Sequence, residues 1–136
     1  MAFLNWTAEC GVGVRQIDQG HKTLFDTVNT LHDSILAGIA GAFLNDCFDK
    51  LDSLAAEQFK TEISLLEQAG YPDVRSHQAI HKMAIEMFAN IRREQSQLDA
   101  RTLAMEVLSV TKGWLLLHIQ QEDRKCGQFL NNKGMH

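Results

Sequence analysis

The sequence predicts an all-α protein, an up-down-up-down antiparallel four-helix bundle with an N-terminal arm. Its 136 residues include a single proline, so long helices can form without interruption. Apolar residues recur at alternating three- and four-residue steps, which is the spacing of one helix face, and strand-like alternation is absent. Breaks divide the chain into four helical segments of about 20 to 28 residues each. The length fits one domain, residues 1–136.

The breaks lie at glycine, proline and polar residues. Gly38 and Gly41 mark the first break, and Gly70–Asp73, which contains the proline, is a turn that marks the second. The polar stretch Gln95–Asp99 marks the third. Short connections between long helices favour antiparallel neighbours, so the segments should run alternately up and down.

Each predicted helix carries a row of inward-facing positions. In chain order the rows are His21, Leu24, Val28, Leu31 and Ile35; Cys47, Leu51, Leu54, Gln58, Glu62 and Leu65; His77, His81, Ala84, Phe88 and Ile91; and Leu103, Val107, Val110, Trp114 and His118. The interior of a bundle is normally apolar, so the polar residues on these rows need an explanation.

The composition excludes several classes of protein. With 45% hydrophobic residues the chain can bury a core, and its net charge of −4 argues against a nucleic-acid binder. No apolar run approaches the roughly 18 residues of a membrane span, and no secretion signal is evident, so we expect a cytoplasmic protein. No C-x-x-C pair is present; we interpret Cys47 as core filler and Cys10 and Cys126 as incidental thiols.

The polar residues on the inward rows should meet at one end of the bundle. In an antiparallel bundle the start of the first and third helices lies beside the end of the second and fourth. Residues four apart share a helix face, which pairs His77 with His81 and Gln58 with Glu62. The polar positions that converge are His21, Gln58, Glu62, His77, His81, His118 and Asp123, the last following His118 by five residues.

This predicted layer needs a positive charge. A buried carboxylate without a partner costs several kcal/mol, and the layer would hold two, Glu62 and Asp123. No lysine or arginine lies on the rows, so a bound metal is the natural partner. Imidazole and carboxylate ligands without thiolate suit iron, with manganese or zinc less favoured. Two carboxylates and four imidazoles exceed the needs of one tetrahedral zinc and suit two metals bridged by the carboxylates.

From about Trp6 to Gly134 the chain resembles the bacterial hemerythrin-like domains, or bacteriohemerythrins. The matching pieces are Trp6; Val12-Gly13-Val14 followed by Ile17-Asp18, His21-Lys22 and Leu24; Phe59 with Glu62; Tyr71-Pro72 with His77 and His81; Trp114-Leu115 with His118-Ile119 and Asp123; and Phe129-Leu130-Asn131 with Lys133-Gly134.

The resemblance implies a single hemerythrin-like domain with two non-haem iron ions (Fe²⁺/Fe³⁺). One iron would be held by His77, His81 and His118, and the other by His21 and one further histidine. Glu62 and Asp123 would bridge them, together with an oxo or hydroxo group. The family binds O₂ at the second iron, which has an open position. The residues that would line the O₂ pocket are Leu24, Phe59, Trp114, Leu115 and Ile119.

The sequence departs from the family at the residue before Phe59, where the family has histidine and this chain has Gln58. Gln58 would either ligate through its amide oxygen, a weaker donor for iron, or turn aside and let water or an exogenous ligand bind. Gly20 is a second departure, which weakens the first helix by about 1 kcal/mol relative to alanine. We expect a more open second iron that favours O₂ or redox sensing over stable O₂ carriage.

The sequence leaves several functions open. The chain could be a simple O₂ carrier or store, or a sensor of O₂ or another small diatomic ligand that acts on a regulatory domain or partner protein. A di-iron enzyme acting on peroxide or nitric oxide ranks third, because the rows offer no proton donor beyond the ligands. A bundle that has lost its metal and serves as an interaction module ranks fourth. We therefore expect a binding protein rather than an enzyme.

Overall fold

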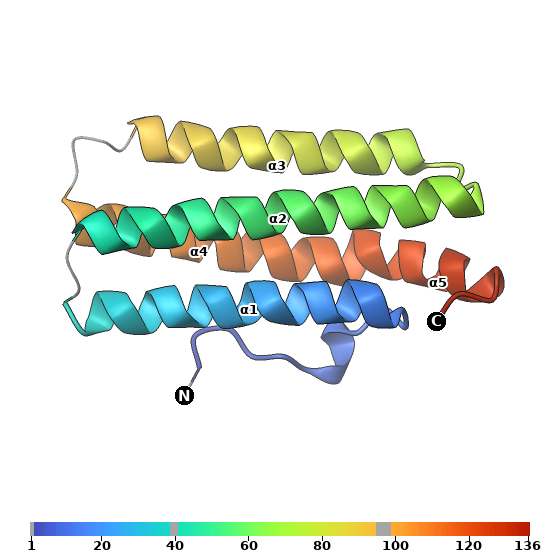
Figure 1. Ribbon diagram of the computed structural model, residues 1–136, viewed down its shortest axis with the longest axis horizontal. Helices are drawn as coiled ribbons and strands as arrows, with labels where there is room; N and C mark the ends of the chain where they lie inside the picture. The colour runs from blue at the N-terminus through green and yellow to red at the C-terminus, as the bar shows by residue number, and fades with distance from the viewer. Residues whose placement is uncertain (1, 39–40, 95–98) are drawn as a thin grey trace.

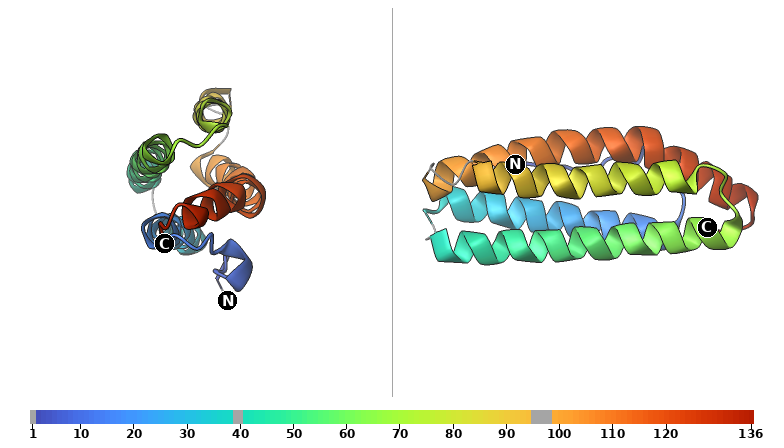
Figure 2. Two further views of the ribbon diagram at one scale, coloured as in Figure 1. Left: turned by 90° about the vertical axis from the view of Figure 1, so that its right-hand side faces the viewer. Right: turned by 90° about the horizontal axis from the view of Figure 1, so that it is seen from above.

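A computed structural model describes residues 2–38, 41–94 and 99–136, and it confirms the predicted antiparallel four-helix bundle. The elements are the 3-10 turn η1 (Ala8–Cys10), the helices α1 (Arg15–Leu36), α2 (Gly41–Ala69), α3 (Val74–Glu94) and α4 (Ala100–His118), the π-helical turn η2 (Ile119–Asp123) and the helix α5 (Arg124–Asn132). The four long helices run alternately up and down (Figure 1), and the end-on view places α1 diagonally opposite α3 (Figure 2).

The helices end where the sequence indicates. Gly38 and Gly70 follow the last residues of α1 and α2 with φ of 76° and 75°, a left-handed conformation that glycine adopts without strain. Of the third break, residues 95–98 lie outside the described residues. Asp99 is described, and its side chain caps α4 by accepting a hydrogen bond of 2.9 Å from the Thr102 backbone N–H.

The inward rows are confirmed for α1 and shifted in α4. All five predicted positions of α1 are buried. In α4, however, Leu103, Val110 and Trp114 are only half-buried. The buried residues of α4 are Ala104, Val107, Leu108, Thr111, Leu115 and His118. Helix α4 contacts three other helices, α1, α2 and α3. The centre of its buried surface is therefore shifted away from the row predicted from the sequence.

Helix α3 is attached differently from the other helices. Of its described side chains, only His77, His81 and Ala84 are fully buried, and Met83 and Ile85 are 68% and 47% exposed. By contrast, α1 buries seven residues, six of them apolar. The position of α3 therefore depends less on apolar packing and more on what its two histidines contact.

The N-terminal arm packs against α1 and α5. The Asn29 side chain donates to and accepts from the backbone of Leu4, both at 2.8 Å, and the Asn131 amide donates to the Gly13 carbonyl at 2.9 Å. A Cβ on Gly127 would lie 2.0 Å from the carbonyl oxygen of Val12, so the arm and α5 approach as closely as their backbones allow. Within the described residues no helix is long and apolar enough to cross a membrane.

Replacing Gly127 by alanine should destabilise the protein. The new Cβ would meet the Val12 backbone, which cannot rotate away as a side chain can, and overpacking of this kind costs about 1–3 kcal/mol. Gly113→Ala is the matched control, because this α4 glycine has open space around its Cβ position and gains helix propensity of up to about 1 kcal/mol. Denaturant unfolding measures both variants, and a Gly127→Ala protein as stable as Gly113→Ala would contradict the packing.

Candidate metal centre

Six predicted site residues meet in one buried layer, at the end of the bundle where α2 connects to α3 (right-hand side of Figure 1). They come from the start of α1 and α3 and from the end of α2, α4 and η2, as the antiparallel topology requires. The six residues, each between 1% and 5% exposed, are His21, Glu62, His77, His81, His118 and Asp123. The predicted convergence is therefore present in the structure.

The two carboxylates lie between His21 and the histidines of α3 and α4. Asp123 places Oδ2 3.1 Å from His21 Nε2, and Oδ1 3.1 Å and 2.9 Å from the Nε2 atoms of His77 and His118. Glu62 places Oε2 3.2 Å from His21 Nε2, and Oε1 3.3 Å and 3.5 Å from the Nε2 atoms of His77 and His81. Each carboxylate thus presents one oxygen to each side, which is the geometry of a bridging ligand.

The donor set fits a bound cation. One ligand atom from each of Glu62, His77, His81, His118 and Asp123 lies within 4.8 Å of all the others. The Nε2 atoms of His81 and His118 are 3.0 Å apart, close enough for both to contact one ion. No lysine or arginine is among the fully buried side chains of the described residues. Nitrogen and oxygen donors at this spacing are what a divalent metal such as iron requires.

A π-helical turn aligns the last two donors. Residues five apart in an α-helix point about 140° away from each other. The wider turn of η2 brings Asp123 back beneath His118, at 2.9 Å, because a π-helix makes i→i+5 hydrogen bonds. The sequence showed the five-residue spacing but not the change of helix type, since π-turns carry no clear local signal.

Without a bound metal, protons on the histidines supply the positive charge that the two carboxylates require. Burial lowers the pKa of His21, but Asp123 and Glu62 outweigh it and raise that pKa to about 10. Burial, together with His77 and His118, lowers the pKa of His81 to about 3, so this imidazole is neutral. Burial raises the pKa of Asp123, but the ion-pair contacts with the imidazoles of His118, His21 and His77 hold it well below its usual range.

Gln58 lies at the edge of this layer as a hydrogen-bond donor. Its Nε2 donates to the Ile17 carbonyl at 3.0 Å and to Glu62 Oε2 at 3.1 Å. The Ile17 carbonyl can only accept, which fixes the amide orientation. The amide oxygen then lies against α1, 1.6 Å from where a Cβ on Gly20 would stand. The two departures from the family pattern are therefore linked. Gly20 has no side chain, and the Gln58 amide fills the space that a side chain there would occupy.

The comparisons with known proteins agree with this geometry. No family model matches the chain. A bacteriohemerythrin of Methylococcus capsulatus is 30% identical over 132 residues, covering 96% of this chain and 99% of the relative. The chain belongs to the hemerythrin family. A bacteriohemerythrin of Pseudomonas aeruginosa is 31% identical over 90% of this chain and 78% of its own length, and a myohemerythrin of Theromyzon tessulatum is 26% identical over 88% of each.

Solved hemerythrin structures have the same fold. The crystal structure of a wild-type hemerythrin superposes with a TM-score of 0.82 at 28% identity, covering 95% of this chain and 98% of that one. The likeness extends over nearly the whole bundle, so the antiparallel arrangement that brings the six site residues together is that of the hemerythrin family.

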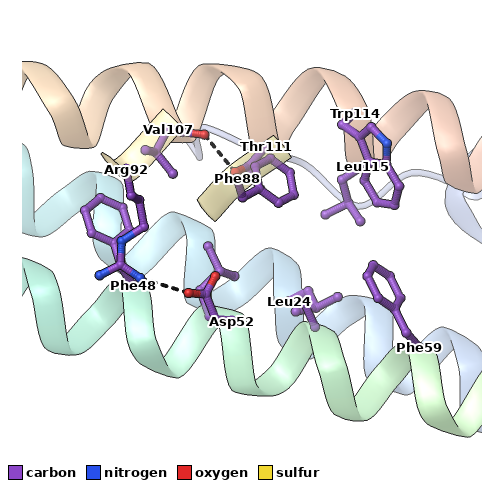
Figure 3. Close-up of a pocket in the computed structure, with 12 residues that line it drawn as sticks. Leu24, Phe48, Asp52, Phe59, Phe88, Arg92, Val107, Thr111, Trp114 and Leu115 are labelled. Atoms are coloured by element: carbon purple, nitrogen blue, oxygen red, sulfur yellow. Dashed lines mark hydrogen bonds and ion pairs between the residues drawn. The ribbon is translucent and has the colours of Figure 1, made fainter. Parts of the chain in front are cut away.

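In this hemerythrin-family chain a mostly apolar cavity adjoins the buried layer (Figure 3). Leu24, Phe59, Trp114 and Leu115, four of the five predicted pocket residues, line it. Ile119 is fully buried but is not among the lining residues. Phe59 stacks on His81 with ring centroids 3.9 Å apart, and Trp114 stacks on His118 at 4.5 Å. The cavity wall and the histidines are therefore in direct contact.

Sequence reasoning missed two residues near this site. Arg92 lines the far end of the cavity and pairs with Asp52 at 2.9 Å (Figure 3). Cys126, which we interpreted as an incidental thiol, places its Sγ 3.5 Å from His77 Nδ1. The one available signal for Cys126 was its position three residues after Asp123, on the same helix face.

The contact between Gly20 and Gln58 predicts a strong coupling between the two positions. Gly20→Ala alone should lower stability by about 1–3 kcal/mol, because its Cβ would displace the Gln58 amide from its buried hydrogen bonds with the Ile17 carbonyl and Glu62. In a Gln58→Ala background the same change should raise stability by up to about 1 kcal/mol through helix propensity. Denaturant unfolding of the metal-free proteins closes the double-mutant cycle, and additive effects would show that the two residues are independent.

Metal removal should loosen α3 more than α1. The fully buried described residues of α3 are two site histidines and one alanine, whereas six apolar residues anchor α1. Hydrogen exchange, compared between metal-loaded and chelator-treated protein, should therefore show the largest loss of protection in α3. Equal loss in α1 and α3, or none in α3, would contradict this dependence.

Proposed function

We propose that the chain is a non-haem di-iron protein that binds O₂ or another small diatomic ligand. The observation that carries the proposal is the buried layer of four imidazoles and two carboxylates beside a mostly apolar cavity. In this proposal His77, His81 and His118 would hold one iron, His21 would hold the other, and Glu62 and Asp123 would contribute to both. Bound iron would supply the reversible binding of the ligand, which none of these side chains can perform alone.

The protein contributes orientation and exclusion of water. The stacking of Phe59 on His81 and of Trp114 on His118 restrains two imidazole planes and covers them with apolar surface. Leu24 and Leu115 complete the apolar wall on the side of the cavity. A small apolar gas partitions favourably into such a space, while water, which would find few hydrogen-bond partners there, does not.

The two proposed iron positions differ in their protein donors. Among the described residues, one position would have His77, His81, His118, Glu62 and Asp123, and the other would have His21, Glu62 and Asp123. Gln58 supports this asymmetry, because its amide hydrogens are directed at Glu62 and the Ile17 carbonyl while its oxygen occupies the space above Gly20. We infer that Gln58 orients Glu62 rather than ligating, and that the second iron is more open and less firmly held.

An open second iron favours sensing over carriage. A carrier must release its ligand unchanged many times, whereas a sensor needs only a change of state that a regulatory domain or partner protein can detect. A simple carrier or store is the second candidate. An enzyme acting on peroxide or nitric oxide is less favoured, since the acid that lines the cavity, Asp52, is paired with Arg92.

The lifetime of the visible absorption that follows addition of O₂ tests this proposal. Diferrous protein prepared without oxygen should develop visible absorption on addition of O₂ and lose it quickly, because the second iron lacks one imidazole. Gln58→His should lengthen the lifetime of that absorption by roughly tenfold, because it restores an imidazole beside the second iron position. Gln68→His, at an exposed position of the same helix, is the control and should change nothing.

Iron content, measured on the same samples, separates the outcomes. Wild-type protein should retain less iron than Gln58→His protein after gel filtration. Wild-type absorption that persists for many minutes would contradict the open second site, and protein that takes up no iron under anaerobic loading would contradict the proposed function itself.

A further inference from the structure

Cys126 stands beside the buried layer in a way that the other cysteines do not. Its side chain is 2% exposed and its Sγ lies 3.5 Å from His77 Nδ1. The other ring nitrogen of His77, Nε2, faces Asp123 and Glu62. Cys10 is buried as deeply, but its sulfur contacts Thr7 in the N-terminal arm. Only one of the two fully buried thiols therefore contacts a site histidine.

The position of the sulfur is well fixed. Cys126 lies on α5 between Asp123, whose carboxylate belongs to the layer, and Gly127, which packs against the Val12 backbone. Burial and the neighbouring Cys126 raise the pKa of Tyr71, in the connection before α3, to about 12. The sulfur therefore lies near the Tyr71 side chain as well as against the His77 ring.

Hydrogen bonding at Nδ1 differs among the site histidines. The Nδ1 atoms of His21 and His81 are buried and have no hydrogen-bond partner among the described residues. His77 Nδ1 has Cys126. A histidine that binds metal through Nε2 carries its hydrogen on Nδ1, and the acceptor of that hydrogen fixes the tautomer and the ring plane. Carboxylate and carbonyl oxygens are the usual acceptors, and here the position is filled by sulfur.

We propose that Cys126 is a positioning residue for the metal centre, which accepts the Nδ1–H of His77 and holds Nε2 toward the metal. This inference rests on the proposed function. A sulfur acceptor is larger and more polarisable than oxygen, so it can hold the ring at a longer distance than an oxygen acceptor. Loss of such an outer partner typically weakens metal binding 10- to 100-fold.

Two variants separate the hydrogen bond from packing. Cys126→Val fills a similar volume without an acceptor, and Cys126→Ser retains an acceptor in a smaller side chain. Cys10→Val is the matched control, since it replaces an equally buried thiol that does not contact the layer. Anaerobic Fe²⁺ titration should give a Kd raised at least tenfold for Cys126→Val, a smaller rise for Cys126→Ser, and no change for Cys10→Val.

A second readout uses the metal-free chain. Long-range ¹H–¹⁵N correlation spectra report the His77 ring nitrogens, and the Nδ1 resonance should shift in Cys126→Val, shift less in Cys126→Ser and stay in place in Cys10→Val. An unchanged Nδ1 resonance, or equal Fe²⁺ affinities for Cys126→Val and Cys10→Val, would overturn the role of Cys126 alone. Wild-type protein that fails to bind Fe²⁺ would overturn the proposed function and this inference with it.

Discussion

The constraint on which the rest of the structure depends is the loss of hydration free energy when Glu62 and Asp123 are buried in one layer. Both side chains are at most 2% exposed, and each would lose several kcal/mol of hydration energy without compensation. Four imidazoles surround them, and no lysine or arginine is fully buried among the described residues. Either protons held on His21 and His77 or bound metal must supply the positive charge. The rest of the bundle is arranged around this requirement.

The same requirement shapes the attachment of the helices. The apolar residues of α1 anchor it along its whole length, whereas α3 contributes mainly His77 and His81 to the interior. The π-turn η2 and the close contact of α5 with the N-terminal arm place Asp123 and Cys126 on the other side of the layer. Helix α3, which has few fully buried apolar residues, is therefore held in part through the polar layer.

Periodicity and antiparallel topology predicted the fold and the convergence of the six donors, because both follow from positions along the chain. Details that depend on three-dimensional packing could not be predicted in the same way. The buried face of α4 is displaced by its contacts with three helices, and the helix type between His118 and Asp123 changes without a sequence signal. The position of Gln58 depends on space above Gly20, and the role of Cys126 depends on the docking of α5.

The central claim is that this buried layer holds two metal ions between His21 and the histidines of α3 and α4. Anomalous X-ray scattering at the iron edge, from crystals of iron-loaded protein, tests it most directly. The account predicts two peaks within the layer, bridged by Glu62 and Asp123, with the peak beside His21 weaker. Peaks confined to the protein surface, or an iron-loaded crystal without any peak between these side chains, would contradict it.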